Sequence, residues 1–256
     1  MRTNVPGQPA YVTIAAYLRE MIKKGELAPG AKLPTNKDLT RDWNVSAIVA
    51  RQAIATLKTE GLIYGVKGKG VFVTERRQLV RVAPSRYSRG KPTRTYRAEA
   101  ATARQKLEKT ANTVQTQATE DIAERLGIEP GDAVSETTYF FRADGVPVTS
   151  SQAWEPLELT AGTAIEWPEQ GPYAHLGVVD RFEQIGQVAT EVQEELVIRM
   201  PEPSEAQHLE IPPGVPLVEV RQTFLSDERP LEIATIMFPA DRYRFVYRMP
   251  IPDHER

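Results

Sequence analysis

The chain has 256 residues, of which 41% are hydrophobic and 26% charged, and this length and balance predict a globular protein of about two domains. It contains no cysteine, which excludes disulfides, thiolate metal sites and cysteine nucleophiles, and its three histidines are too scattered for a transition-metal cluster, so we expect no metal or other cofactor. The net charge of −2 hides an asymmetry that suits a nucleic-acid-binding domain joined to a domain of another kind, because residues 1–97 contain 19 Lys and Arg against 6 Asp and Glu, and the rest contains 13 against 28.

Residues 1–9 are polar, contain two prolines and predict a loose arm. From Ala10 to Lys24 apolar side chains recur at helical spacing, which predicts an amphipathic first helix that Gly25 ends. No apolar run approaches the ~20 residues that a membrane helix needs, and no signal peptide is recognised. We therefore expect a cytoplasmic, nucleoid-associated protein.

The next stretch predicts two further helices and a hairpin. Thr35 can cap one helix, Ser46 can cap the other, and Gly61 stands where a left-handed residue would end it. The β-prone runs Leu62–Tyr64 and Val71–Val73 flank a basic glycine loop. Such an order is typical of a winged helix-turn-helix, which places its last helix in a DNA major groove. The alternative is an ordinary small α+β core with a solvated loop.

The residues that would touch DNA follow from this reading, because the N-terminal part of such a helix lies nearest to the base edges. We expect contacts from this helix start and from the hairpin loop: Ser46, Ala47, Val49, Arg51, Lys67, Gly68 and Lys69. A glycine lets the backbone approach a minor groove, and lysines attract phosphates. For each residue, a solvated surface position is the alternative.

Residues 75–97 contain eight basic residues and two prolines, which predicts a linker rather than a buried element. Residues 98–112 give only a weak helical pattern. Further on, residues 171–177 give a brief helical pattern, and residues 187–198 and 241–248 are β-prone.

An internal repeat begins near Thr119. At a constant offset of 83 positions, the following residues recur: Ala123 with Ala206, Leu126 with Leu209, Ile128 with Ile211, Gly131 with Gly214, Phe141 with Phe224, Asp144 with Asp227 and Pro147 with Pro230. Each copy predicts a short helix, a Pro-Gly turn, a strand, a tight turn and a returning strand. Two copies are too few for a solenoid, so we expect a duplicated antiparallel-sheet domain.

The first part of the chain resembles the GntR family of transcription factors. The matching positions run through residues 11–73 without a gap: Tyr11, Leu18, Ile22, Gly25, Pro29, Gly30, Leu33, Pro34, Leu39, Val45, Ser46, Arg51, Ala53, Leu57, residues 60–63 and residues 68–73. The resemblance implies that Lys37 occupies a position where relatives usually have an arginine that contacts guanine. Ala47 stands where relatives commonly have another arginine, so this chain departs from the family at both positions.

The second part resembles the UTRA effector domain of the HutC subfamily, whose fold is similar to that of chorismate lyase. The resembling pieces are residues 129–132, 143–147, 173–176, 212–217, 229–232 and 240–245. The implied fold class is α+β, with a winged helix-turn-helix over 1–74, a basic linker over 75–97 and an antiparallel-sheet effector and dimerisation domain over 98–250. The implied effector-binding residues are Tyr139, Phe141, Arg142, Ser151, Tyr173, Glu232 and Phe238.

The effector itself is not implied by the resemblance. Relatives that bind phosphorylated sugars often have two arginines where this chain has Tyr139 and Phe141, and Arg142 on the same strand should face the other way. Phosphate recognition is therefore weakened, which favours an effector that stacks on rings or is more apolar. Sheet core is the alternative for the two aromatic residues, whereas Glu232 needs a partner for its carboxylate.

Three functions remain open on the sequence. The first is a homodimeric repressor that a small molecule releases from a palindromic operator. The second is a DNA-binding regulator without an effector, for example of a mobile element. The third is a lyase-like enzyme with a DNA-binding appendage, which we do not expect because no nucleophile–base pattern, metal set or phosphate loop is present.

Overall fold

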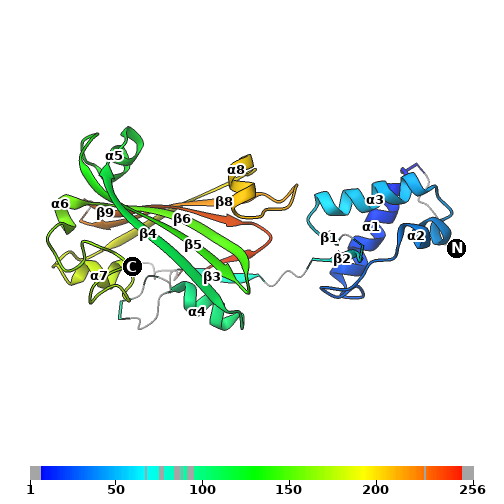
Figure 1. The fold of residues 1–256 in the computed structure, drawn as a ribbon, viewed down its shortest axis with the longest axis horizontal. Helices are drawn as coiled ribbons and strands as arrows, with labels where there is room; N and C mark the ends of the chain where they lie inside the picture. Colours follow the sequence, from blue (N-terminus) through cyan, green and yellow to red (C-terminus); the bar gives the residue numbers. More distant parts are fainter. Residues whose placement is uncertain are drawn as a thin grey trace, which may run out of the picture. The chain divides into compact units, whose positions relative to one another are not determined.

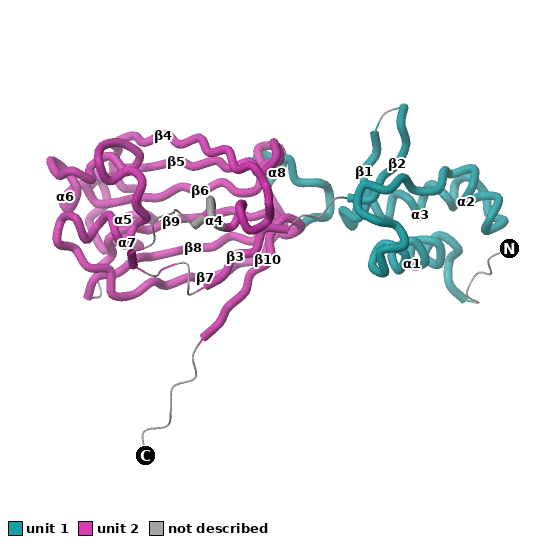
Figure 2. Tube along the Cα trace, turned by 90° about the horizontal axis from the view of Figure 1, so that it is seen from below, with its two compact units in different colours: residues 1–77, 202–206, 210–215 teal, residues 78–201, 207–209, 216–256 magenta. Residues whose placement is uncertain are grey.

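The structure is a computed structural model that describes residues 7–66, 68–74, 78–83, 87, 89–90, 95–227 and 229–249. The chain divides into two compact units, coloured separately in Figure 2. The first consists of residues 1–77 with 202–206 and 210–215, and the second of residues 78–201, 207–209 and 216–256. Among the described residues, no helix is both long enough and apolar enough to cross a membrane.

Over residues 10–73 the first unit holds three helices and a hairpin in the predicted order (Figure 1). These elements are α1 Ala10–Lys23, α2 Asn36–Trp43, α3 Ala47–Thr59, β1 Ile63–Val66 and β2 Gly70–Val73. Thr35 and Asp38 form a capping box: the Thr35 side chain accepts from the Asp38 amide at 3.2 Å, and the Asp38 carboxylate accepts from the Thr35 amide at 3.0 Å. Ser46 accepts from the Val49 amide at 3.4 Å, and Gly61 has a φ of +64°. The predicted helix starts are thus confirmed.

One hydrophobic core unites the helices of this unit with its hairpin. Ile14, Leu18 and Leu57 are fully buried, and each such side chain contributes about 1.5–3 kcal/mol. The Tyr17 and Trp43 rings meet edge to face with centroids 5.5 Å apart, which joins α1 to α2. The packing fixes which side of α3 is left for solvent.

The second unit is built on a six-stranded antiparallel sheet with the order β4-β5-β6-β9-β8-β7 (Figure 1). Its strands are β4 Leu107–Gln117, β5 Ala133–Ala143, β6 Val146–Pro156, β7 Glu191–Arg199, β8 Leu217–Ser226 and β9 Arg229–Pro239. The strand register aligns Phe141, Ser151, Ile236 and Val220 on one face, which we call the inner face. The outer face carries the alternate residues, such as Phe140 and Thr235.

The predicted repeat is confirmed by this sheet and extends further than the sequence pattern indicated. The helices α5 Glu120–Leu126 and α8 Pro203–His208 both begin at equivalent positions of the repeat, 83 residues apart. The register of each copy shifts at the same point, between Phe141 and Arg142 and again between Phe224 and Leu225. The edge strands β4 and β7 also correspond, because Leu107 pairs with Ala143 and Glu191 with Leu225 in matching registers. The domain is therefore a duplicated β-α-β-β unit.

A two-stranded parallel sheet accompanies the inner face, formed by β3 Leu79–Ala83 and β10 Tyr243–Tyr247. Strand β3 lies in the segment that the sequence predicted to be a linker, and that prediction is wrong for residues 79–83. Alternate side chains of β3 are buried, including Arg81, whose charge is paired inside the domain. The basic composition was misleading because Arg81 is buried against a carboxylate, Glu194, that offsets the cost of removing its charge from water.

Short helices complete the second unit: α4 Thr95–Thr102, α6 Leu157–Thr160 and α7 Val178–Glu183. Figure 1 shows α5 on the side of the sheet opposite to α4 and β3. The Arg125 guanidinium on α5 donates to Thr235 Oγ1 at 3.0 Å, which fixes α5 to the outer face. Residues 171–177 form turns and the helix α7 begins after them, so the helical prediction there was displaced. The weak helical pattern over residues 98–112 holds only as far as Thr102.

Candidate DNA-binding surface and effector site

The solvent side of α3 is the first candidate surface. Ala47 and Arg51 are exposed on it, together with the capping residue Ser46. Val49 is half-buried and packs on the helical core, so less of its side chain is open to solvent than at Ala47 or Arg51. Ile48 is instead 67% exposed. Helical spacing alone could have identified this side, because the core takes Ala50, Ala53, Ile54 and Leu57 and leaves Ile48, Arg51 and Gln52 for solvent.

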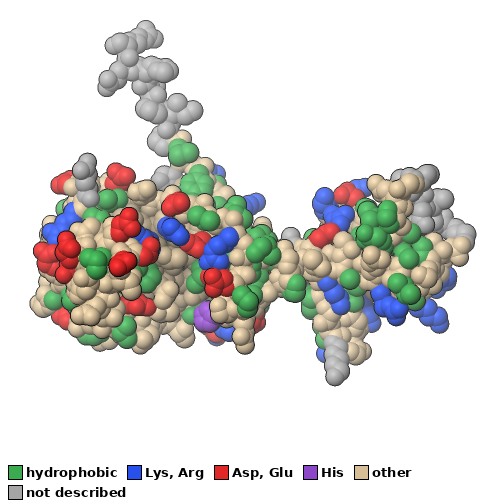
Figure 3. Space-filling model, turned by 90° about the horizontal axis from the view of Figure 1, so that it is seen from above, with side chains coloured by type: hydrophobic (Ala, Val, Ile, Leu, Met, Phe, Trp, Pro, Cys, Tyr) green, Lys and Arg blue, Asp and Glu red, His purple; other side chains and the backbone are tan. Residues whose placement is uncertain are grey.

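Lys37 and the hairpin loop flank this helix within the same unit. Lys37 is exposed in the first turn of α2, and Lys69 is exposed next to Gly68. Gly68 has a φ of +77°, and a Cβ added there would meet nothing within 4 Å, so its tip is open. Lys67 lies outside the described residues. Figure 3 shows lysine and arginine side chains at several places on the first unit, whereas acidic side chains are more frequent on the second.

The strand residues predicted for the effector site share the inner face, with one exception. Tyr139 and Ser151 are direct partners on β5 and β6, and the rings of Tyr139 and Phe141 lie 6.2 Å apart. Tyr96 of α4 stacks on Phe141 at 4.4 Å, which makes Phe141 part of a packed aromatic group. Phe238 is fully buried against the ring of Tyr243 at 4.6 Å. The two phenylalanines are therefore core residues in this structure.

Arg142 is the exception. Its guanidinium lies over the Phe140 ring at 5.1 Å and donates to the Gly145 carbonyl at 2.8 Å. Phe140 belongs to the outer face, so Arg142 points away from Tyr139 and does not join the predicted site. The alternation of side chains along a strand predicted this direction.

A buried cluster of charges lies on the inner face beside α7. Arg181 donates to Glu155 Oε2 at 3.0 Å and to Glu232 Oε2 at 3.4 Å, and the side chains of all three are at most 8% exposed. Burial disfavours the charged guanidinium, but the two carboxylates outweigh it and raise the pKa of Arg181. Burial, with the charges of Glu169 and Glu232, raises the pKa of Tyr139 well above its ordinary value, so its phenol is neutral. Glu232 thus has the partner that its carboxylate requires, and that partner is Arg181.

The sequence pattern missed Glu155 and Arg181. They are 26 positions apart, and Glu232 follows Arg181 by 51, so no local spacing links the three. Tyr173 is half-buried and packs beside Ile165 and Phe182 over this end of the sheet.

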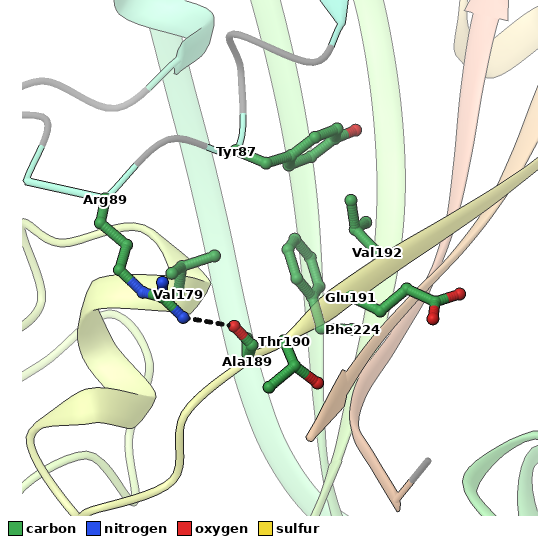
Figure 4. A pocket seen from close by; sticks show the side chains of 8 residues that line it. All are labelled: Tyr87, Arg89, Val179, Ala189, Thr190, Glu191, Val192 and Phe224. Carbon is green, nitrogen blue, oxygen red and sulfur yellow. Dashed lines mark hydrogen bonds between the residues drawn. The ribbon is translucent and has the colours of Figure 1, made fainter. Parts of the chain in front are cut away.

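A cavity of about 310 Å³ opens on the inner face at β7 and β8, and β8 is three strands away from the strand of Tyr139 (Figure 4). Figure 4 shows the rings of Tyr87 and Phe224 on this space, with Val179 of α7 and Val192 of β7 at its sides. Arg89 lies at one edge, where it donates to the Ala189 carbonyl at 2.7 Å.

The hydroxyl of Tyr87 belongs to a buried polar network that includes β3. It accepts from Arg81 at 2.9 Å and from the Gln222 amide at 2.8 Å, and it donates to Glu194. Arg81 also donates to Glu194 Oε2 at 2.9 Å, and Tyr247 donates to the same oxygen at 3.5 Å. Burial alone would raise the pKa of Glu194, but these hydrogen bonds and the Arg81 charge outweigh it and lower that pKa.

Comparisons with known proteins agree with this architecture. The profile described as "Bacterial regulatory proteins, gntR family" matches residues 10–73, and that of the UTRA domain matches residues 109–244. The HTH-type transcriptional repressor NagR of Bacillus subtilis (strain 168) is 26% identical over 94% of this chain and 95% of its own length. The Mannosyl-D-glycerate transport/metabolism system repressor MngR of Escherichia coli (strain K12) is 25% identical over 93% of this chain and 95% of its own.

Solved structures give the same assignment. A GntR-family transcriptional regulator is 35% identical over 96% of this chain and 99% of that chain, with a TM-score of 0.69. PhnF of Mycobacterium smegmatis shares the fold at 17% identity, with a TM-score of 0.57 over 93% of this chain and 100% of that chain. These relatives are regulators and not enzymes, in agreement with the expectation for this chain. The chain belongs to the GntR family of bacterial transcriptional regulators and carries the UTRA domain typical of its HutC-like members.

Proposed function

We propose that this DNA-binding transcriptional regulator is a repressor that binds a palindromic operator as a homodimer and is released by a small-molecule effector. The observation that carries the proposal is the solvent-exposed side of α3. Ser46 caps the start of this helix, and the first two turns expose Ala47, Ile48, Arg51 and Gln52 to solvent. A helix that is packed on one side and free on the other suits insertion into a major groove.

The chemistry of α3 indicates how bases would be read. Arg51 can donate two hydrogen bonds to guanine, and Gln52 can form a bidentate pair with adenine. Ala47 and Ile48 can offer only apolar contacts, such as one to a thymine methyl group. We therefore propose a reading surface with fewer arginines than that of relatives, whose sequence preference depends on Arg51, Gln52 and these apolar contacts.

The flanking cations would hold the duplex. Lys69 at the hairpin tip and Lys37 on α2 are exposed and can neutralise phosphates, while the open tip at Gly68 permits close backbone approach. We place Lys67 in the same role on its sequence position alone. Phosphate contacts of this kind fix the register of the protein and carry no sequence information.

Dimerisation would set the distance between the two recognition helices. Two recognition helices that read a palindrome must bind half-sites about one helical turn, ~34 Å, apart. The names of NagR and MngR describe both as repressors. A repressor that spans a promoter as a dimer can be released when an effector alters the distance between its two reading helices.

The effector would be held by the acidic inner face. Tyr139, Ser151 and Glu232 lie there, and Tyr173 packs against the cluster of Phe182, but no guanidinium is contributed at position 139 or 141. The Arg181 guanidinium is already bound by two carboxylates. A phosphorylated ligand would meet net negative charge, so a neutral or cationic effector fits better.

Salt dependence tests the DNA-binding mode. The affinity of the full chain for a fragment containing its own promoter should fall linearly on a log–log plot as salt rises, with a slope near −0.9 for each phosphate contacted. An unrelated fragment of equal length gives the non-specific control. A promoter affinity that equals this control, or that does not depend on salt, would refute specific recognition through this surface.

A further inference from the structure

The cavity at β7 and β8 borders one end of the surface that the resemblance identifies and extends beyond it. Phe224 and Val192 are direct partners on neighbouring strands, and Phe224 is also the partner of Glu232 on its other side. The cavity therefore adjoins Glu232, is separated from Ser151 by β9, and is separated from Tyr139 by β9 and β6. By the repeat, Phe224 corresponds to Phe141, whose ring is covered by Tyr96 in the first copy. In the second copy Tyr87 meets Phe224 only edge to face at 5.8 Å, and space remains beside them.

The walls of this cavity define the chemistry of a ligand. Two aromatic rings and the side chains of Val179, Val192 and Ala189 form its apolar part. Its volume of about 310 Å³ lies at the lower end of the range for small-molecule sites, roughly 300–1,000 Å³. These features suit a compact molecule with one flat ring, which gains from contacts with the edges and faces of both aromatic side chains.

The charges at its edge select against anions. Among the described residues that line the cavity, Glu191 is the one acid and Arg89 the one base, and Arg89 pairs with Glu183 at 2.5 Å. Asp180 accepts from the Gly90 amide at 3.0 Å nearby. Among the described residues, Glu191 on one side of the cavity and Glu183 and Asp180 near the opposite edge therefore outnumber the Arg89 guanidinium. A cationic group on the ligand is attracted by these carboxylates and by the faces of the rings, whereas an anionic group is repelled by the carboxylates.

Tyr87 connects the cavity to the strand that follows the DNA-binding unit. Its ring lines the cavity, and its hydroxyl is bound to Arg81 and Glu194. Arg81 lies on β3, which begins five residues after Thr74 in the sequence. A ligand that moves the Tyr87 ring must also move a hydroxyl shared by two buried charges. Few arrangements of such a network keep every polar group hydrogen-bonded, and each buried group left without a partner costs free energy.

We propose that this cavity binds a small, uncharged or cationic ring compound and that Tyr87 transmits its presence through Arg81 to β3. The inference rests on the proposed function, in which a small molecule controls operator binding. The ligand and the operator then influence each other through one coupling free energy, which for known allosteric proteins corresponds to roughly 5–150-fold in affinity.

The site is tested first with three probes that share a ring and differ in charge: indole, tryptamine and indole-3-acetate. At millimolar concentration, tryptamine and indole should raise the melting temperature of the full chain, and indole-3-acetate should raise it least. Val192→Phe fills the cavity and should abolish the shift. Ile198→Phe is the matched control, because Ile198 lies on the same strand and is 72% exposed. If Val192→Phe does not fold, Ala189→Leu fills the same space.

The coupling is tested with Tyr87→Phe, which keeps the ring in the cavity wall and removes only the hydroxyl. This variant should still bind tryptamine, but tryptamine should change its affinity for the promoter fragment less than twofold, against at least fivefold for the unmodified chain. Tyr247→Phe is the matched control: it removes a hydroxyl bound to the same Glu194, at the longer distance of 3.5 Å, and does not line the cavity. It should retain the response.

The outcomes separate this inference from the proposed function. If none of the three probes shifts the melting temperature, if the cavity-filling variants bind as well as the unmodified chain, or if indole-3-acetate binds best, the site is refuted. If Tyr87→Phe responds as fully as the unmodified chain, the path through Arg81 is refuted. In all these cases specific promoter binding of the unmodified chain can persist, and the proposed function then stands without this site. Loss of promoter binding in the unmodified chain would instead refute the proposed function.

Discussion

Arg81 and Glu194 form a buried ion pair that fastens the first strand of the second unit to the edge strand of its main sheet. Their side chains are 0% and 7% exposed, and Arg81 NH1 lies 2.9 Å from Glu194 Oε2. The two residues are 113 positions apart in the sequence, so the pair joins distant parts of the second unit.

Arg81→Ala should therefore destabilise the second unit strongly. Removing one partner leaves a buried, uncompensated carboxylate, which costs about 3–5 kcal/mol. The measurement is urea unfolding followed by far-ultraviolet circular dichroism. Arg199→Ala is the matched control, since Arg199 on β7 pairs with Glu219 in a position 32% exposed and should cost about 0–1 kcal/mol. Equal effects of the two variants would contradict the structural role of the Arg81 pair.

The same pair predicts a dependence of stability on pH. The pKa of Glu194 is lowered in the folded chain, so its contribution to stability is complete above the unfolded pKa of about 4.3 and is lost as the pH falls through the folded value. The difference in unfolding free energy between the unmodified chain and Glu194→Gln should be constant above about pH 5 and should shrink below about pH 4. A difference that grows on acidification would mean that the carboxylate is not held in its ionised form.

Arg51→Ala should weaken operator binding by about 1–3 kcal/mol and relax the preference at one base pair if the side chain reads a guanine. The melting temperature should hardly change, because Arg51 is exposed and outside the core. Lys58→Ala is the matched control at the other end of α3, where a positive charge is also exposed. Titration of a labelled promoter fragment with each variant measures its operator affinity. Uniform weakening across all sequences would assign Arg51 to phosphate instead.

Ile48→Ala tests the apolar part of the reading surface. Ile48 is 67% exposed, so truncation should change the unfolding free energy by no more than about 0.5 kcal/mol. Operator affinity should nevertheless fall severalfold as a methyl contact is lost. Ile198→Ala, at a side chain 72% exposed, should change neither quantity. An Ile48 variant with unaltered operator affinity would exclude this side chain from the interface.

Local chemistry made the first unit predictable. Thr35 and Ser46 predicted two helix starts, because a side-chain oxygen at that position accepts hydrogen bonds from the exposed amides of the first turn. The recurrence of Phe141 as Phe224 predicted the duplicated sheet, because similar residues form the same turns and the same strand register in each copy.

Long-range pairing was not visible in the sequence. Arg81 was interpreted as part of a solvated linker because Glu194 stands 113 positions away. Arg181 was missed because both its carboxylate partners come from distant strands. The partial burial of Val49 beside the exposed Ile48 depended on how α3 packs in the helical core, and not on the composition of α3 itself.

The central claim is that this chain reads a two-fold symmetric operator with the free side of α3. Hydroxyl-radical footprinting of the full chain on its own promoter fragment tests it most directly. The account predicts two protected half-sites of inverted sequence, with centres about one helical turn apart, and loss of both in Arg51→Ala at the same protein concentration. A single protected half-site, protection without sequence symmetry, or an unchanged footprint in Arg51→Ala would contradict it.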